Sequence, residues 1–231
     1  MISVSNTKQG SEIFIEEVRQ VKTFIDSIHL PEPFPGQPCL SSVMALATFR
    51  EIFGKEIDAS CSINVSNLSL NGVIENVGQA IQLGAKRIML EGRLWDDSPQ
   101  VSKLDPASTL ETLRSLALRP PLVELGLQAY ASETGILKQT HQVRPDFLMI
   151  RVEHDPEELE PALKIVAGMN TKVLVRLSVP ETRGVGFLVD KVLANTASII
   201  NDLRKEGISV VLGSHDNFDE ALAVLKKVKR P

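Results

Sequence analysis

The chain has 231 residues, of which 43% are hydrophobic, and a formal net charge of −4 at pH 7. Its Lys and Arg residues form no basic stripe, which argues against a nucleic-acid partner, and no apolar run approaches the roughly 18 residues of a membrane span. Two cysteines, Cys39 and Cys61, are too few for a disulfide framework or a thiolate metal site. The N-terminus lacks the basic, apolar and small-residue order of a secretory signal, so we expect a cytoplasmic protein.

One unit recurs along the chain: a helix, a glycine and a short apolar run. Gly54, Gly84 and Gly207 each stand between an amphipathic stretch and such a run. A glycine just past a helix is the usual left-handed cap, and a short apolar run after it is typical of a buried strand. In chain order, we expect strands at 2–5, 25–30, 57–64, 87–90, 122–130, 147–153, 172–178 and 208–213. The expected helices are 12–24, 41–53, 74–83, 108–118, 133–142, one beginning at Pro156, 185–205 and 218–229.

These eight strand–helix pairs use up the chain, and alternation of this kind indicates a parallel α/β structure. A length of 231 residues is at the low end for a (βα)8 barrel, for which about 250 is typical. We therefore predict an α/β fold with a single TIM-barrel domain over residues 1–231, without a second domain or linker.

Most of the expected strands alternate between apolar and polar residues. In 147–153, Ile150 and Val152 share one face, and Arg151 and Glu153 share the other. A parallel sheet packed only for stability would be apolar on both faces. We expect the apolar face to meet the helices, which leaves a polar, charged interior at the C-terminal ends of the strands.

Active sites of TIM barrels lie at the C-terminal ends of the strands. The candidates for moving protons there are Glu91, Glu153 and His154. The candidates for binding an anionic or polar small molecule are Arg93, Arg151, Arg176, Gln128 and Asn64, since guanidinium groups bind carboxylate and phosphate oxygens. The alternative is an internal salt-bridge layer without a ligand.

The segment before the last helix contains Gly213 and Ser214, at a place where these barrels often bind phosphate on backbone N–H groups. The alternative is that Asp216 or Asn217 simply caps the helix. Two His-Asp pairs, at 154–155 and 215–216, have only generic spacing, so no metal site is predicted.

Several segments resemble the methylenetetrahydrofolate reductase family, whose members are flavin-dependent (βα)8 barrels. EIFGKEIDASCSINVSN, LGAKRIMLEGRL and PDFLMIRVEHDPEEL are similar to successive runs of that family, and LVELGLQAYASE is similar to its flavin-contacting strand. The resemblance spans nearly the whole chain. It implies that Ala129 and Tyr130 contact a flavin, FAD.

The chain departs from this family at positions that carry its chemistry. The first strand, ISVSN, offers serines where the family has a catalytic glutamate. Arg93 stands at the family's flavin-side aspartate, and Arg151 stands at its folate-contacting glutamine. The resemblance thus implies a divergent barrel.

Three functions stay open from the sequence. The first is an oxidoreductase acting on a pterin or folate carrier of one-carbon units, or on another anionic small molecule, with or without flavin. The second is a non-catalytic barrel that serves as a subunit or binds a protein partner, or forms a homo-oligomer. The third is a pterin- or corrinoid-linked methyltransferase, which needs the same anion-binding arginines but no flavin.

Overall fold

The computed structural model describes residues 1–3, 11–32, 40–92, 104–116, 123–152, 156–179, 189–213 and 218–228. Its strands are β1 Ile2–Ser3, β2 Ser27–Leu30, β3 Asp58–Asn64, β4 Arg87–Glu91, β5 Glu124–Tyr130, β6 Phe147–Val152, β7 Lys172–Ser178 and β8 Ser209–Gly213. Its α-helices are α1 Ser11–Val21, α2 Ser42–Phe53, α3 Leu70–Gln82, α4 Pro106–Ser115, α5 Thr134–Val143, α6 Leu159–Val166, α7 Val189–Lys205 and α8 Phe218–Lys227. Two 3-10 turns are η1 Val65–Asn67 and η2 Pro156–Glu158.

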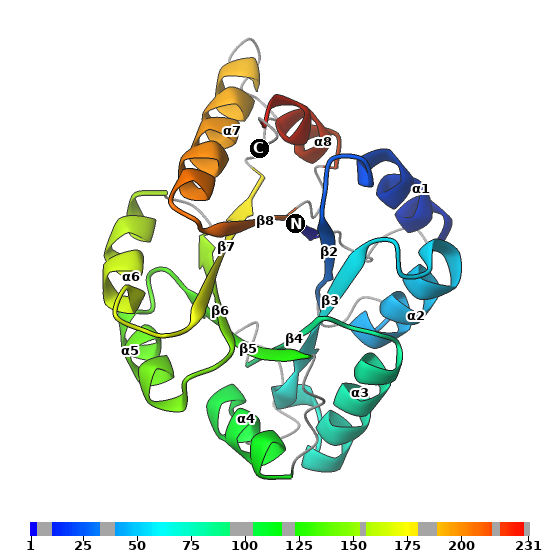
Figure 1. Ribbon diagram of the computed structural model, residues 1–231, viewed down its shortest axis with the longest axis vertical. Coiled ribbons are helices and arrows are strands. Elements are labelled where there is room, and N and C mark those ends of the chain that lie inside the picture. The colour runs from blue at the N-terminus through cyan, green and yellow to red at the C-terminus, as the bar shows by residue number, and fades with distance from the viewer. Residues whose placement is uncertain are drawn as a thin grey trace.

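The strands form a closed barrel in chain order, in which every neighbouring pair is parallel and β1 pairs with both β2 and β8. The helices surround this barrel as an outer ring (Figure 1). The predicted (βα)8 TIM barrel is therefore confirmed. Element bounds agree with the sequence prediction to within a few residues, except that Pro156 begins the turn η2 and α6 starts at Leu159. None of the helices that the structure describes has the length and apolar character needed to cross a membrane.

The glycines that follow the helices reverse the chain as the sequence predicts. Gly84 has a φ of 75° and Gly207 a φ of 78°, in the left-handed region where a side chain is strained. At the end of α3 the Gly84 N–H donates to the carbonyl of Ile81 over 2.9 Å, and the Ala85 N–H donates to Ala80 over 3.0 Å. These bonds satisfy helix carbonyls that would otherwise have no donor and direct the chain into β4.

The two faces of the strands bury different side chains. Ile150, Val152 and Cys61 belong to the apolar core between the strands and the helices. A smaller apolar cluster fills the middle of the barrel and consists of Met89, Phe147, Met149, Leu174 and Val211. The interior is thus polar at its C-terminal end, as predicted. It is also polar at its N-terminal end, and between the two ends lies an apolar layer that the alternation did not indicate.

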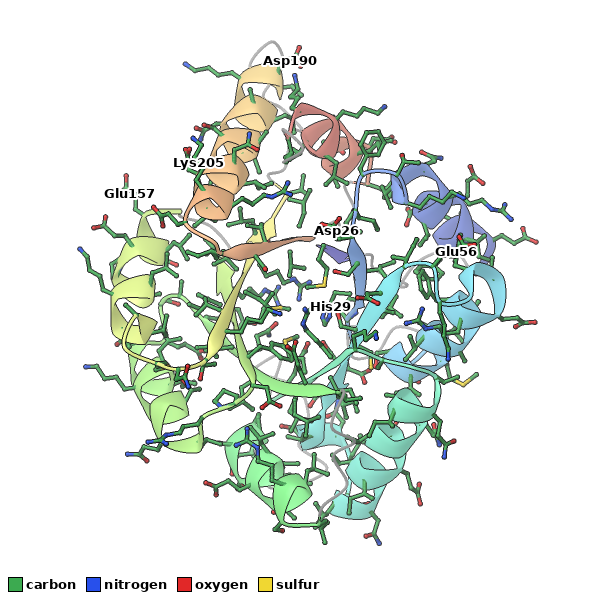
Figure 2. All side chains as sticks on the ribbon, in the orientation of Figure 1. Asp26, His29, Glu56, Glu157, Asp190 and Lys205 are labelled. Atoms are coloured by element: carbon green, nitrogen blue, oxygen red, sulfur yellow. The ribbon has the colours of Figure 1, made fainter. Side chains whose placement is uncertain are left out.

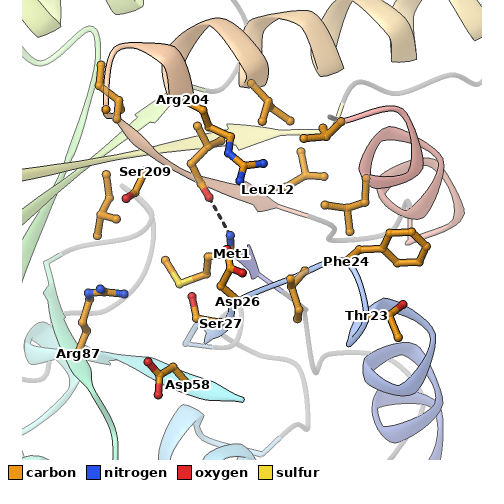
Figure 3. Close-up of a pocket in the computed structure, with 18 residues that line it drawn as sticks. Met1, Thr23, Phe24, Asp26, Ser27, Asp58, Arg87, Arg204, Ser209 and Leu212 are labelled. Carbon is orange, nitrogen blue, oxygen red and sulfur yellow. Dashed lines mark hydrogen bonds between the residues drawn. The ribbon is translucent and has the colours of Figure 1, made fainter. Parts of the chain in front are cut away.

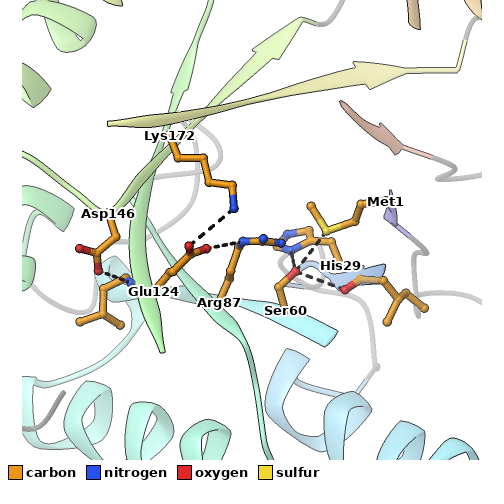
Figure 4. A network of polar contacts seen from close by, with 9 residues as sticks. Met1, His29, Ser60, Arg87, Glu124, Asp146 and Lys172 are labelled. Atoms are coloured by element: carbon orange, nitrogen blue, oxygen red, sulfur yellow. Dashed lines mark hydrogen bonds and ion pairs between the residues drawn. The ribbon is translucent and has the colours of Figure 1, made fainter. Parts of the chain in front are cut away.

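An ion-pair network lies at the N-terminal end of the interior (Figure 4). The Arg87 Nε lies 2.5 Å from a carboxylate oxygen of Glu124, and the Lys172 Nζ lies 3.6 Å from the other oxygen. The three residues are the inward positions at the starts of β4, β5 and β7. Because they are partly exposed, we assign them a modest stabilising role.

Gly126 on β5 lies against the ring of Phe147 on β6. A Cβ atom at position 126 would lie 2.4 Å from two ring carbons of Phe147, which is closer than real contacts allow. We expect Gly126→Ala to lower the free energy of unfolding by about 1–3 kcal/mol through overpacking. Gly78→Ala, in α3, is the matched control, because a Cβ there meets nothing within 4 Å. It should raise stability by about 0.5–1 kcal/mol, and urea denaturation of both variants checks the contrast.

Candidate functional site

Three of the predicted charged residues meet inside the C-terminal end of the barrel. Glu91 ends β4, Arg151 is near the end of β6, and Arg176 is its directly paired neighbour on β7. Their exposed fractions are 2%, 7% and 3%. Both arginines exert a favourable Coulomb effect on the Glu91 carboxylate. The structure thus brings an acid and two guanidinium groups together in a buried setting, where charge interactions are stronger than in water.

The pKa of the Glu91 carboxyl group is raised above that of an ordinary glutamate. Burial raises its pKa, while a hydrogen bond with the Ser62 side chain and the charges of Arg176 and Arg151 act in the opposite direction. Burial has the larger effect, so the group holds its proton at pH values where an ordinary glutamate is ionised. Among the described residues, its Oε1 atom has no hydrogen-bond partner. An unsatisfied buried oxygen is costly unless a water or ligand completes it.

The arginines are held against two residues that the sequence also singled out. The Arg151 guanidinium carbon lies 5.3 Å from the centroid of the Tyr130 ring, a cation–π distance. A Cβ at Gly213 would lie 3.4 Å from the Arg176 Nε, so the missing side chain at this position leaves room for the guanidinium group. Tyr130 and Gly213 therefore lie beside the arginines, where each can influence what binds them.

A second carboxylate, which the sequence pattern did not indicate, belongs to this end of the barrel. Glu32 stands two residues after the end of β2, and its Oε1 accepts a hydrogen bond from the Ser42 hydroxyl over 3.0 Å. Burial and the charge of Glu91 raise the pKa of Glu32 to about 7, against backbone hydrogen bonds from Ser42 and Asn64. The only local signal was its position between two prolines, which indicates a loop and says nothing of its neighbours.

His29 on β2 points into the barrel and is fully enclosed (Figure 2). Its Nδ1 lies 3.0 Å from the Ser60 hydroxyl, and its Nε2 lies 3.0 Å from the Ser62 hydroxyl, both on β3. Burial, followed by the charges of Arg176 and Arg87, lowers the pKa of His29 to about 3. The imidazole is thus neutral at ordinary pH and bridges the Ser60 and Ser62 hydroxyl groups.

The other predicted site residues differ in what their side chains do. The Asn64 Oδ1 accepts the Ser66 N–H over 3.0 Å and so caps η1, although Asn64 is paired with Glu91 across the sheet. The Gln128 Oε1 is buried and has no hydrogen-bond partner within the described ranges. Ala129 turns its side chain into the outer apolar core. Arg93, Glu153, His154 and Ser214 lie outside the described residues.

The described part of the chain contains no group of three or more His, Cys, Asp or Glu residues that could hold a metal ion. A cavity of about 740 Å³ lies at the opposite, N-terminal end of the barrel (Figure 3). It is lined by residues that precede or begin strands, among them Asp26, Asp58 and Ser209. In this fold the N-terminal end of the barrel serves stability and the active site lies at the C-terminal end, so we place the candidate site with Glu91.

No protein-family model matches the chain. No curated protein sequence matches it either. Among solved structures, it is similar to a candidate aldo-keto reductase from Pseudomonas aeruginosa, with a TM-score of 0.64, 11% identity, and coverage of 98% of this chain and 87% of that chain. An aldolase gives a TM-score of 0.63 at 12% identity, covering 98% and 93% of the two chains. The 3-hexulose-6-phosphate synthase from Salmonella typhimurium gives 0.57 at 11% identity, covering 98% and 97%. At these identities the similarity demonstrates the TIM-barrel fold alone.

Proposed function

We propose that this protein is an enzyme that binds a small anionic substrate at the C-terminal end of its barrel and transfers a proton through Glu91. The observation that carries the proposal is the buried Glu91 carboxyl group, which faces Arg151 and Arg176 and has one oxygen without a partner among the described residues. The barrels to which the chain is similar include an aldolase and a synthase of a sugar phosphate, which supports a role in processing small molecules.

The charges at the site favour an anion when Glu91 is protonated. A neutral Glu91 carboxyl group does not attract the positive charges of Arg151 and Arg176. A carboxylate or phosphate group of the substrate can then interact with both arginines. A protonated carboxyl group beside such an anion can donate its proton to a nearby substrate oxygen or carbon. After donation, the Ser62 hydroxyl and the two arginines stabilise the carboxylate. Glu91 would thus act first as a general acid and then as a base.

A pterin or folate substrate fits the same chemistry, because the resemblance to methylenetetrahydrofolate reductases points to such a ligand and folates carry carboxylates. Tyr130 offers a ring beside Arg151 against which a heterocycle could stack. This finer assignment rests on the resemblance, as does the one-carbon role.

A flavin fits the described residues poorly. Of the two residues expected to contact FAD, Ala129 directs its side chain into the outer core, while Tyr130 lies beside Arg151. FAD therefore stays a proposal from the resemblance, and no step is assigned to it. An absorption spectrum of the purified protein after incubation with FAD and gel filtration tests it, and a colourless protein would remove the cofactor.

Anion binding should depend on Arg176. We expect Arg176→Met to weaken binding of inorganic phosphate or of folate roughly 10- to 150-fold, because a hydrogen bond to a charged group contributes about 1.5–3 kcal/mol. Isothermal titration calorimetry measures this directly. Arg19→Met is the matched control, since Arg19 is on the surface, 3.6 Å from Glu16, and should bind as wild type does.

Equal affinities of wild type and Arg176→Met would show that the bound anion lies elsewhere. Failure of the wild type to bind phosphate, acetate or folate would count against the enzyme proposal. Such a failure would favour the non-catalytic barrel, in which the charged residues of the interior only stabilise the fold.

A further inference from the structure

We propose that Gln128 makes the site specific for a hydroxylated anion, such as a polyol phosphate, by accepting a hydrogen bond from a hydroxyl group of the substrate. In this arrangement the hydroxyl lies between the Gln128 and Glu91 side chains, while the anionic group binds Arg151 and Arg176. Such specificity rests on the proposed function, to which it adds the class of substrate and the residue that selects it.

Gln128 and Glu91 occupy adjacent positions on neighbouring strands. Leu90 of β4 is paired with Leu127 of β5. The next residues of these two strands are Glu91 and Gln128. Because neighbouring strands lie about 4.8 Å apart, the two side chains start from adjacent positions and can contact the same small group.

Both side chains point into the barrel. Glu91 is two residues after Met89, which belongs to the apolar cluster of the interior. Gln128 is two residues after Gly126, which lies against the ring of Phe147 in that same cluster. Since alternate residues of a strand share a face, Glu91 and Gln128 continue the inner face towards the C-terminal end.

Each of the two side chains has a buried oxygen atom that lacks a hydrogen-bond partner. Within the part of the chain that the structure describes, neither the Gln128 Oε1 nor the Glu91 Oε1 has one. Most buried polar atoms of proteins are paired, because an unpaired atom loses its hydration without compensation. Two such oxygens at adjacent inward positions indicate that a polar group of a ligand completes them.

A hydroxyl group has the chemistry that both oxygens require. The amide oxygen of Gln128 only accepts, whereas the carboxyl group of Glu91 donates when it holds its proton and accepts when it is ionised. A hydroxyl can accept from the protonated Glu91 and donate its own hydrogen to Gln128 at the same time. An ammonium group cannot accept, and the positive charges of Arg151 and Arg176 disfavour it.

The arginines and Gln128 belong to successive levels of the barrel interior. Gln128 is paired with Met149 of β6, and Arg151 is two residues further along that strand, beside Arg176 of β7. Two residues of a strand span about 6.6 Å, so the arginines lie nearer the mouth and Gln128 lies deeper. A short polyol phosphate can therefore place its phosphate at the arginines and a hydroxyl at Gln128.

The test is isothermal titration calorimetry of the full-length protein with glycerol 3-phosphate and with n-propyl phosphate. The two compounds share the phosphate and the three-carbon chain and differ in two hydroxyl groups. We expect glycerol 3-phosphate to bind roughly 5- to 150-fold more tightly, since a ligand that covers a buried acceptor without offering a donor loses this much affinity.

The outcomes of this comparison distinguish the specificity from the proposed function. Equal affinities for the two esters would overturn the specificity and leave anion binding at the site intact. If neither ester bound, the site would not take a polyol phosphate and the specificity would again be wrong. Binding of inorganic phosphate, acetate or folate then decides the proposed function separately.

Gln128→Met tests whether Gln128 is the residue that selects the hydroxyl. The variant keeps the length of the side chain but removes the acceptor, so the preference for glycerol 3-phosphate should fall at least roughly 5-fold. Gln82→Met is the matched control, because Gln82 is exposed at the end of α3, and this variant should keep the full preference. A preference that persists unchanged in Gln128→Met would refute the assignment.

The stability of Gln128→Met separates a role in recognition from a role in the fold. Removal of a buried acceptor that lacks a partner should leave the free energy of unfolding in urea unchanged or higher. A lower free energy of unfolding, together with an unchanged ligand preference, would show that Gln128 serves the fold rather than the ligand.

Discussion

Acidification from pH 6.5 to about 3 is expected to remove about 5 kcal/mol of folding free energy through His29 alone. The pKa of this residue falls from 6.5 to about 3 on folding, and each unit corresponds to about 1.36 kcal/mol. The pKa of His29 is lower in the folded state, so below pH 6.5 the unfolded chain binds a proton at this residue and the native state does not. The contribution is fully present above pH 6.5 and is lost as the pH falls towards 3.

Urea denaturation at a series of pH values measures this effect as a difference between wild type and His29→Gln. Glutamine offers a donor and an acceptor but does not titrate. The variant should therefore be less stable than the wild type at neutral pH, and its free energy of unfolding should fall less on acidification. If the free energies of unfolding of the two proteins changed in parallel between pH 6.5 and about 3, the lowered pKa of His29 would be contradicted, even if one protein were more stable throughout.

Glu32 is expected to give the opposite slope, with a loss of about 3 kcal/mol as the pH rises. Folding raises the pKa of Glu32 from 4.5 to about 7, and the conversion is again about 1.36 kcal/mol per unit. Below pH 4.5 both states hold the proton; between 4.5 and about 7 only the native state does, so stability falls with pH in that window. Above about 7 the loss is complete.

Glu32→Gln should therefore remove the fall in stability between pH 4.5 and about 7. Glu17, a residue of α1, shares this window because burial and the charge of Asp219 raise its pKa to about 7 as well. Glu17→Gln is thus the matched control, and only Glu32→Gln should also lower the midpoint of Glu91, because it removes a neighbouring negative charge. A stability profile of Glu32→Gln that runs parallel to that of the wild type would mean that Glu32 stays ionised in the fold.

These two residues also illustrate why parts of the site could not be predicted. Alternation along the strands put His29, Ser60 and Ser62 on the polar face, and the structure confirms that face as the interior. The pattern contains no information on register, and the contacts of His29 join residues 31 and 33 positions apart. The pattern could not indicate Glu32 either, because its proximity to Glu91 depends on how the segment after β2 lies against β3 and β4.

The sequence by itself determined the fold, through helix–glycine–strand repeats and the two-residue period of strands such as β6 and β7. These signals are local: a glycine closes a helix, and a strand has two faces because successive side chains point in opposite directions. It also determined which residues could lie inside the C-terminal end, including Glu91, Arg151 and Arg176. Tertiary structure alone decided which of them meet, because closure of the barrel sets the stagger between strands. That stagger places His29 between Ser60 and Ser62, brings Glu32 to the same end as Glu91, and buries the Glu91 carboxyl group.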